Sequence, residues 1–298
     1  MHRHIIYIIN PISGTRTKKD LQVFVEQKTK EQGVDFDIFP SVANGDYSFL
    51  KPVIKQKKAT DIVIAGGDGT VSQVISSLMD TNVNFGILPC GSGNGLAFTA
   101  RIPKQPAKAL EVIFKGHSSI TDGFYINGIF AVHLCGLGFD AKVAHDFAQQ
   151  PKRGFVTYIQ QVIKNFFSAK NYAFELQVEG KSFSTEAFFI SIANSNQFGN
   201  HFTIAPKASL SDGLLDIVVV THQQKLSLIL QTLKQVMGSN PLQTEIKDEK
   251  KSVVYFQTSE LTIVNKDKAP LHIDGDPAET AKKFKIEIAK NCFRLLQP

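Results

Sequence analysis

Cysteine is scarce in this sequence. Only Cys90, Cys135 and Cys292 occur in 298 residues, too few and too scattered for a disulfide framework or a structural zinc site. The eight histidines show no HExxH or other ligand spacing, so no zinc centre is expected. A reduced, cytoplasmic setting is the default expectation.

Long apolar runs are missing as well. No stretch approaches the roughly 18 consecutive apolar residues of a membrane-spanning helix. The apolar run at residues 5–9 is too short for the core of a signal peptide. Any contact with a membrane is therefore expected to be peripheral.

Two widespread catalytic motifs are absent, and the charge balance is only mildly basic. Neither GxSxG nor GxxxxGK[ST] occurs, which disfavours hydrolase and P-loop functions. Lys+Arg 33 against Asp+Glu 27 gives a net charge of +6, which favours anionic partners such as nucleotides or acidic lipid surfaces. No segment interleaves aromatic and basic residues as a nucleic-acid surface does, so no nucleic-acid partner is expected.

Residues 61–79 (DIVIAGGDGTVSQVISSLM) are the most informative stretch. Small and β-favouring residues at 62–65 run into the loop GGDGT at 66–70, after which apolar residues recur at helical spacing. This order predicts a strand, a glycine turn and a helix. The glycines allow backbone N–H groups to approach a phosphate, and the N-terminus of the helix favours an anion there.

Asp68 is the unusual member of this loop. A bare carboxylate repels phosphate unless a cation or a donor stands between them, which suggests a Mg²⁺–nucleotide or a hydroxyl substrate. The alternative is a plain turn in which Asp68 caps its own helix through Thr70 or Val71. The loop alone leaves both interpretations open.

Three more strand–turn–helix patterns occur in the first 115 residues or so. Their strands are expected at 5–9, 36–39 and 84–89, followed by loops at 10–15, 41–46 and 90–97. Four such units predict an open parallel sheet with its loops gathered at the carboxyl ends of the strands, where ligands bind. The loop at Asn10 also fits an ordinary Asn-Pro turn.

The pattern changes after residue 120. Short apolar runs separated by Gly, Asn and Asp turns predict an antiparallel β-sandwich or barrel-like second domain, interrupted by one helical insertion at about 155–167. We therefore expect an α/β domain at 1–120 and an all-β domain at 121–279. The pattern alone does not assign the tail at about 280–298 to either domain.

Two acidic turns lie in the second domain, at 208–216 (ASLSDGLLD) and 272–277 (HIDGDP). A carboxylate beside backbone carbonyls suits a hard divalent cation, and the pair Asp274 and Asp276 could divide metal and base functions. Each segment taken alone also fits a β-turn with Asp and Gly in their preferred places.

Taken in order, five motifs resemble the diacylglycerol kinase catalytic-domain superfamily, above all its soluble bacterial lipid kinases and the sphingosine kinases. They are NPISG at 10–14, GGDGT at 66–70, LPCGSGN at 88–94, the segment 204–216 and DGDP at 274–277. The resemblance extends from residue 5 to about 295. It implies an N-terminal α/β nucleotide-binding domain and a C-terminal β-sandwich that carries lipid- and metal-binding residues, with the tail returning to the first domain.

The same resemblance implies the ligands and their residues. ATP would be the phosphoryl donor, bound between the two domains, and Mg²⁺ a cofactor. The implied ATP-binding residues are Asn10, Pro11, Ile12, Ser13, Gly14, Ser41, Gly66, Gly67, Asp68, Gly69, Thr70, Val71, Ser72 and Ser92. A structural Mg²⁺ would be held by the Asp212 side chain and the backbone carbonyls of Ser209 and Leu214.

By this resemblance Asp276 is the general base, and we expect Asp68 and Asp274 to hold or orient catalytic Mg²⁺. The family usually carries Glu where Asp276 stands. Because Asp is one methylene shorter, it could need a water relay or a shifted backbone to come within about 3 Å of a substrate hydroxyl. GSGNG at 91–95 also departs from the GTGND of bacterial diacylglycerol kinases and looks closer to the sphingosine kinase version.

The expected function is Mg²⁺-dependent transfer of the γ-phosphoryl group of ATP to the hydroxyl of diacylglycerol, sphingosine or a related lipid. One alternative is an NAD kinase, which shares the GGDG loop, although its Asn-Glu signature has no clear equivalent here. Another is a non-catalytic nucleotide- or lipid-binding regulator. Peripheral membrane contact is expected at 150–167, where basic residues precede an apolar stripe that could equally pack on the sandwich; a homodimer is left open.

Overall fold

The computed structural model describes residues 3–11, 18–151, 155–168, 170–199, 202–221 and 253–298. The chain divides into two compact units, one made of residues 1–121 and 291–298 and the other of residues 122–290. It passes between the units within two strands, β5 (Ser118–Ile126) and β17 (Lys283–Leu296). The sequence patterns predict the first boundary near residue 120, and the family resemblance implies the second near residue 280.

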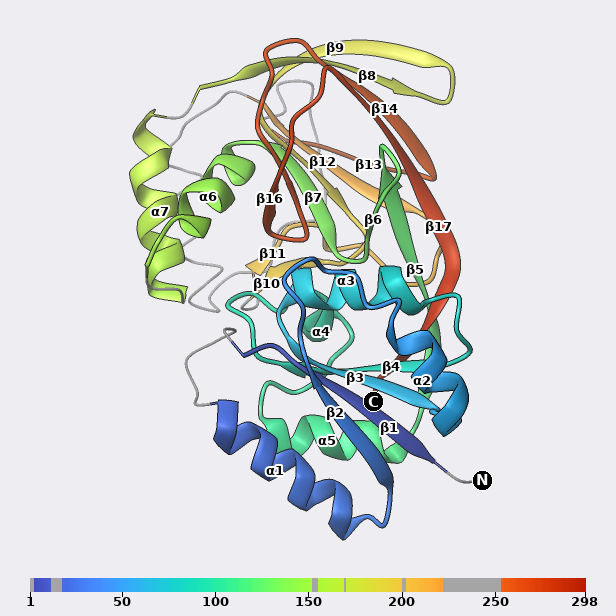
Figure 1. The fold of residues 1–298 in the computed structure, drawn as a ribbon. Coiled ribbons are helices and arrows are strands. Elements are labelled where there is room, and N and C mark those ends of the chain that lie inside the picture. The colour runs from blue at the N-terminus through green and yellow to red at the C-terminus, as the bar shows by residue number, and fades with distance from the viewer. Residues whose placement is uncertain (1–2, 12–17, 152–154, 169, 200–201, 222–252) are drawn as a thin grey trace. The chain divides into compact units, whose positions relative to one another are not determined.

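The first unit is built on a parallel sheet. Its strands are β1 (His4–Ile9), β2 (Asp35–Pro40), β3 (Asp61–Gly66) and β4 (Asn84–Pro89), in the spatial order β2-β1-β3-β4, with the end of β17 parallel to β4. Its helices are α1 (Lys18–Glu31), α2 (Leu50–Lys57), α3 (Asp68–Leu78), α4 (Gly95–Thr99) and α5 (Pro106–Lys115). In Figure 1, α1 and α5 lie on one face of this sheet and α3 on the other.

Burial explains the composition of these strands. Every residue of β1 and β3 is buried, because helices cover both faces of the sheet, and their near-continuous apolar runs follow from that position. The edge strand β2 is only partly buried and alternates acidic with apolar residues. Parallel strands bring all their carboxyl ends to one edge, which is where the loops of interest begin.

A polar network fixes the opposite edge of the same sheet. The buried carboxylate of Asp61 accepts hydrogen bonds from Arg3 Nε at 2.7 Å and from Asn84 Nδ2 at 3.0 Å. The remaining guanidinium nitrogens of Arg3 donate to two carbonyls at the end of α5, at 2.8 and 2.6 Å. This network joins β1, β3, β4 and α5 at the amino ends of the strands.

The second unit is antiparallel. Its further strands are β6 (Ile129–Ala131), β7 (Leu134–Gly138), β8 (Tyr172–Val178), β9 (Lys181–Ala193), β10 (Gln197–Gly199), β11 (Phe202–Thr203), β12 (Leu215–Thr221), β13 (Val253–Thr258), β14 (Glu260–Asn265), β15 (Leu271–Ile273) and β16 (Asp276–Ala278). The long strand β9 pairs with β8 through its first half and with β7 and β12 through its second half. The strand β9 therefore connects β8 with β7 and β12. Apolar side chains from these strands form a core.

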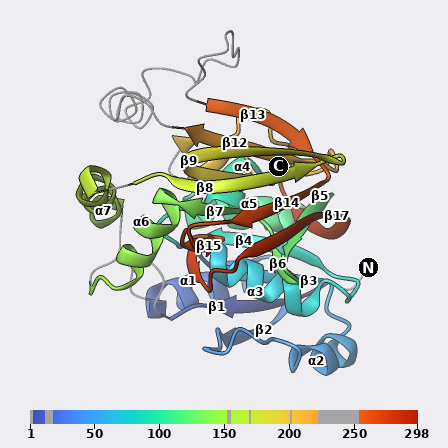
Figure 2. The ribbon, with the colours of Figure 1, turned by 90° about the horizontal axis from the view of Figure 1, so that it is seen from above.

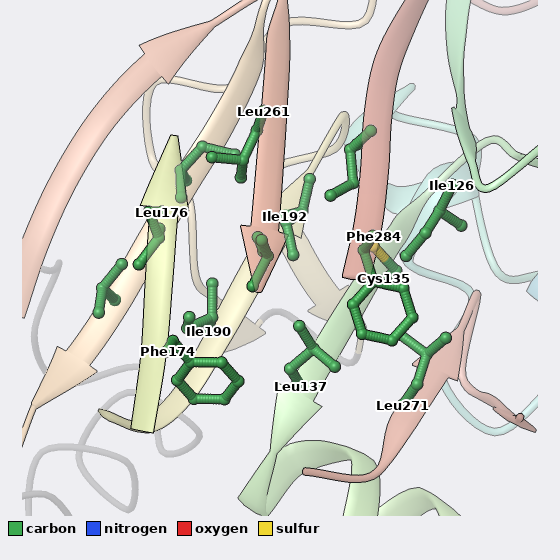
Figure 3. Packing of buried hydrophobic residues seen from close by; sticks show 14 of the residues in the cluster. Ile126, Cys135, Leu137, Phe174, Leu176, Ile190, Ile192, Leu261, Leu271 and Phe284 are labelled. Carbon is green, nitrogen blue, oxygen red and sulfur yellow. The ribbon is translucent and has the colours of Figure 1, made fainter. Parts of the chain in front are cut away.

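Figure 3 shows this core. It brings together residues from β5, β7, β8, β9, β14, β15 and β17: Ile126, Cys135, Leu137, Phe174, Leu176, Ile190, Ile192, Leu261, Leu271 and Phe284. Members of β7 and β9 alternate with residues that face the other side, as the two-residue period of a strand requires. The expected fold class, an α/β nucleotide-binding domain followed by an antiparallel β-sandwich domain, is confirmed.

In the described part of the second unit, the helices α6 (Phe139–Ala148) and α7 (Phe155–Ser168) accompany the strands. They lie on the same side of the strands in both views (Figures 1 and 2), and α6 packs on β7, β15 and β16. The sequence patterns predicted α7 but missed α6, because its apolar stripe is short and follows directly on a glycine-rich strand. Among the described residues, no helix is long and apolar enough to cross a membrane.

Candidate active site

The loops that follow the parallel strands begin from fixed positions. The backbone nitrogens of Asn10, Ser41 and Cys90 lie 2.9, 3.0 and 2.9 Å from carbonyl oxygens of β3, β1 and β3, respectively. Each of these bonds extends the sheet by one residue into a loop. The three loops and the loop after β3 are therefore neighbours along one edge.

Asn10 links the first of these loops to the GGDGT loop. Its Nδ2 donates to Thr70 Oγ1 at 2.8 Å. Gly66 leaves room for the same threonine, because a Cβ at residue 66 would lie 2.8 Å from Thr70 Cβ. Pro11 is exposed. The other residues expected in this loop lie outside the described part of the chain: Ile12, Ser13 and Gly14.

The two glycine loops touch through their backbones. A Cβ at Gly91 would lie 2.5 Å from Gly67 Cα, and a Cβ at Gly67 would lie 3.1 Å from Gly91 Cα. Asn94 closes the second loop: its Oδ1 accepts the Gly91 N–H at 2.7 Å, and its Nδ2 donates to the Gly91 carbonyl at 2.8 Å. Neither glycine can gain a side chain without separating the loops, so these positions serve close approach.

The side chain of Asp68, in the first glycine loop, also binds the segment that follows the second loop. Its carboxylate accepts the backbone N–H groups of Gly95 at 3.0 Å and Leu96 at 3.2 Å, which are the first residues of α4. It therefore caps α4 and not its own helix, whose N-cap is Gly67 without a side-chain cap. The negative charge is offset by N–H donors at a helix N-terminus, which favour it.

The remaining expected nucleotide-binding residues differ in burial. Val71 and Ser72 are buried in the first unit. Ser92 is partly exposed in the second loop. Ser41 hydrogen-bonds Tyr47, and burial of that phenol raises the pKa of Tyr47.

In the second unit, Asp274 is enclosed by backbone donors. Its carboxylate accepts the N–H groups of three consecutive residues at 3.1, 2.9 and 3.0 Å: Val132, His133 and Leu134. Only 4% of Asp274 is exposed, and its own N–H donates to the Leu134 carbonyl at 2.8 Å. Three such donors fix the position of the carboxylate and orient both of its oxygens.

Asp276 has the opposite environment, two residues further on. Asp274 (φ 49°) and Gly275 (φ 84°) form a two-residue hairpin turn between β15 and β16, with Ile273 opposite Asp276. Positive φ at both central residues is the geometry that Asp-Gly favours in tight hairpins. The side chain of Asp276 is exposed, so this carboxylate is accessible to a substrate.

The other acidic turn is clamped by a residue that the sequence patterns did not single out. Asp122 Oδ2 accepts the Gly213 N–H at 2.8 Å, and the Asp122 N–H donates to the Leu210 carbonyl at 2.7 Å. Within the turn, Asp212 Oδ1 accepts the Leu214 N–H at 3.0 Å while the residue stays exposed. The loop conformation is therefore set from outside as well as by Asp212.

Asn194 joins the two acidic turns into one buried network. Its Nδ2 donates to the carbonyls of Asp122 at 2.8 Å and Val132 at 2.9 Å, and the segment that starts at Val132 donates to Asp274. The neighbouring Ser195 hydrogen-bonds His133. The structure thus brings together Asp274, the 132–134 backbone and the 209–214 loop.

The expected magnesium sites can be judged by the ligand atoms that they offer. The ligands expected at Asp212 are one carboxylate and backbone carbonyls, the hard oxygen ligands that Mg²⁺ prefers, so the chemistry of these residues fits. No group of three or more His, Cys, Asp or Glu side chains in the described residues is arranged for a metal. The Lys290 ammonium also lies 3.1 Å from where a Cβ on Gly213 would be, placing a positive charge beside this loop.

As ligands of a catalytic metal, Asp68 and Asp274 are less well suited. Two and three backbone donors, respectively, already occupy their carboxylates. Binding a cation directly would compete with the bonds that hold the loops. Their metal-binding function stays a prediction. The hydrogen bonds show that both carboxylates hold the backbone of another segment in place.

The comparisons with known proteins cover both units. The family model of the diacylglycerol kinase catalytic domain matches residues 4–125. The model of the YegS C-terminal NAD kinase beta sandwich-like domain matches residues 134–296, which is more than half of the chain.

Curated relatives and solved structures agree with these models. A diacylglycerol kinase of Bacillus subtilis is 24% identical over 90% of this chain and 88% of its own. A protein of Citrobacter koseri named "Probable lipid kinase YegS-like" is 25% identical over 90% and 88%, respectively. The crystal structure of a diacylglycerol kinase from Bacillus anthracis superposes with a TM-score of 0.72 at 18% identity, covering 100% of this chain and 97% of that one.

Two family models match in succession along the chain, and together they cover both units. The chain therefore belongs to the diacylglycerol kinase catalytic-domain family of lipid kinases.

Proposed function

We propose that the protein transfers the γ-phosphoryl group of ATP to the hydroxyl group of a lipid. The observation that carries this proposal is the loop edge of the parallel sheet, where Gly67 and Gly91 bring two backbone loops together beside the N-terminus of α3. Such an edge offers backbone N–H groups and a helix dipole to phosphate oxygens. Membership in a family of lipid kinases supplies the acceptor class.

In this proposal the residues of the chain position the reactants. Asn10 and Thr70, with the two glycine loops, bind the nucleotide phosphates, and Asp276 accepts the proton of the acceptor hydroxyl. Phosphoryl transfer depends mainly on positioning and on neutralising charge, which suits the backbone donors of the first unit. The reaction also needs a proton acceptor, and the exposed carboxylate of Asp276 in the second unit is suited to that role. Mg²⁺, when bound, would neutralise phosphate charge; Asp212 with the carbonyls of Ser209 and Leu214 would hold a structural ion.

Peripheral membrane contact is part of the same proposal, because the acceptor is a lipid. On α7, Ile163 is 49% exposed and Lys164 is exposed beside it, whereas Phe166 of the same helix is buried against Phe139 and Phe188. An apolar side chain next to a basic one on a helix surface is suited to an anionic bilayer. We expect the protein to float with vesicles that contain anionic lipid and Ile163→Ser to weaken that binding.

A labelled-phosphate assay tests the proposal. The purified protein would be incubated with Mg²⁺ and γ-labelled ATP against diacylglycerol, sphingosine, a total lipid extract and NAD in separate reactions. Label in a lipid fraction supports the proposal and identifies the acceptor class. A parallel series with chelator in place of Mg²⁺ tests the metal requirement.

The same assay distinguishes the alternatives. Label in NADP would establish an NAD kinase, whose two-domain plan resembles this one. ATP binding with no labelled product in any reaction would indicate a non-catalytic nucleotide-binding protein. Either outcome overturns lipid phosphorylation as the activity.

A further inference from the structure

A histidine–carboxylate pair lies directly behind the turn that carries Asp276. His272 is on β15, two residues before Asp274, and is only 3% exposed. Its neighbours Leu271 and Ile273 face the apolar core of the second unit. Because side chains alternate along a strand, His272 points to the opposite face, where α6 packs.

The partners of His272 define which ring nitrogen carries the proton. The Gly275 N–H points at His272 Nδ1, with 3.3 Å between the two nitrogens, so Nδ1 must be the unprotonated acceptor. The proton of the neutral ring is then on Nε2, which lies 3.4 Å from Asp140 Oδ2. Both distances are long for hydrogen bonds, so the pair orients the ring more than it binds tightly.

Asp140 is itself held in place. It is the second residue of α6 and is 8% exposed. Its Oδ1 accepts the N–H of Ala141 at 2.8 Å. The carboxylate thus links the first turn of α6 to the histidine on β15.

A glycine makes room for this pair. Gly136 on β7 is paired with His272 across the sheet. A Cβ at residue 136 would lie 1.9 Å from Asp140 Oδ2 and 2.6 Å from His272 Nε2, both inside van der Waals contact. Gly136 is not among the glycines with positive φ, so its backbone does not demand glycine; the space for the two side chains does.

We propose that His272, oriented by Asp140 in the space left by Gly136, is a positioning residue for Asp276. The turn is then held on two sides: Asp274 binds three backbone N–H groups, and the Gly275 N–H is bound by His272. Asp276 is the next residue, so the backbone of the turn sets the direction of its side chain. This inference rests on the proposed function, in which Asp276 is the base.

The two ring nitrogens can be separated by amide substitutions. His272→Asn keeps an oxygen acceptor near the Nδ1 position, whereas His272→Gln places its amide near Nε2 and removes the acceptor for Gly275. Gly136→Ala disturbs the pair without altering either polar group. His4→Asn is the matched control, because His4 is also buried and its Nε2 lies 2.8 Å from Asp37, in the first unit.

We expect His272→Gln and Gly136→Ala to lower kcat at least about tenfold, with KM for ATP within about twofold. His272→Asn should retain kcat within about threefold of the wild type, and His4→Asn should leave kcat unchanged. A loss of kcat that follows the melting temperature across all four variants, or wild-type kcat in His272→Gln, would overturn the proposal.

A second readout does not depend on activity. Amide hydrogen exchange of the peptide spanning 271–278 should accelerate in His272→Gln and stay near wild-type in His272→Asn, because only the latter keeps an acceptor for Gly275. Unchanged exchange in His272→Gln would overturn the positioning even in an inactive preparation. Lack of any phosphoryl transfer by the wild type, with the expected exchange difference present, would instead count against the proposed function alone.

Discussion

The glycine-loop edge of the first unit and the acidic turns of the second unit both contain aspartate next to glycine, but the carboxylates meet different surroundings. Asp68 caps a helix that begins 27 residues further along the chain. Asp274 is buried under three backbone donors, while Asp276, across one glycine, is exposed. Burial and nearby N–H groups, more than the local motif, therefore decide which carboxylate organises the backbone and which is available for chemistry.

The sharpest test of this comparison is Asp276→Asn. An exposed carboxylate contributes little to stability, so the melting temperature should stay within about 1 °C of the wild type. If Asp276 is the base, kcat for lipid phosphorylation should fall about 10²- to 10⁴-fold, with ATP affinity retained. Steady-state kinetics and calorimetry measure the two effects, and full turnover in a folded variant would remove Asp276 from the mechanism.

The same substitution at the buried Asp274 should mainly lower stability. Asp274→Asn leaves one oxygen to accept and places an NH₂ group against backbone N–H donors, costing about 3 kcal/mol. The melting temperature of the second unit should drop on the order of 10 °C. Asp276→Asn is the control, since it makes the same chemical change two residues away. Equal melting temperatures for the two variants would contradict the contrast between them.

Asp68→Asn is expected to have an intermediate effect. The amide oxygen keeps one of the two N–H groups of α4 and loses the other, which costs about 1 kcal/mol. Because the same carboxylate joins the two glycine loops, the loss of this hydrogen bond should also raise KM for ATP. Isothermal titration with ATP and a melting curve report the two quantities; a large fall in kcat with unchanged ATP binding would instead favour the metal-binding function of Asp68.

The smallest effect concerns Asp216 on β12, and it depends on pH. Burial raises the pKa of this carboxyl above its ordinary value, although Tyr255 and Gln257 donate hydrogen bonds that oppose the shift. A raised pKa means that the folded protein holds the proton more tightly than the unfolded chain. The corresponding stability is complete below the ordinary carboxyl pKa of about 4 and is lost as pH rises through the folded-state pKa.

Asp216→Asn removes that dependence. The melting temperature of the variant should gain on the wild type as pH is raised from about 4 to 7, by on the order of 1–2 °C. Thermal melts over this pH range, with Asp276→Asn as the exposed-carboxyl control, measure the difference. A gap between variant and wild type that does not change with pH would show that burial does not raise this pKa.

The fold could be predicted from the sequence wherever the signal was local. Four strand–turn–helix patterns predicted the parallel sheet, and the Asp-Gly sequence at 274–275 indicated a β-turn as one interpretation, because these patterns depend on neighbours in the chain. The partners of Asp274 and Asp122 could not be found in this way. They lie about 140 and 91 residues away, and their donors are backbone N–H groups that every residue except proline possesses. The helix cap that Asp68 provides was missed for the same reason.

The contact between Gly67 and Gly91 couples the two glycine loops mechanically. No side chain separates the two backbones, so neither loop can shift toward the other. Asp68 ties the second loop to the first, and Asn94 holds the second loop in its own conformation. A ligand that orders one loop must therefore order both. In a hydrogen-exchange experiment, a nucleotide that touches only residues 66–72 should leave a footprint over residues 90–96 as well.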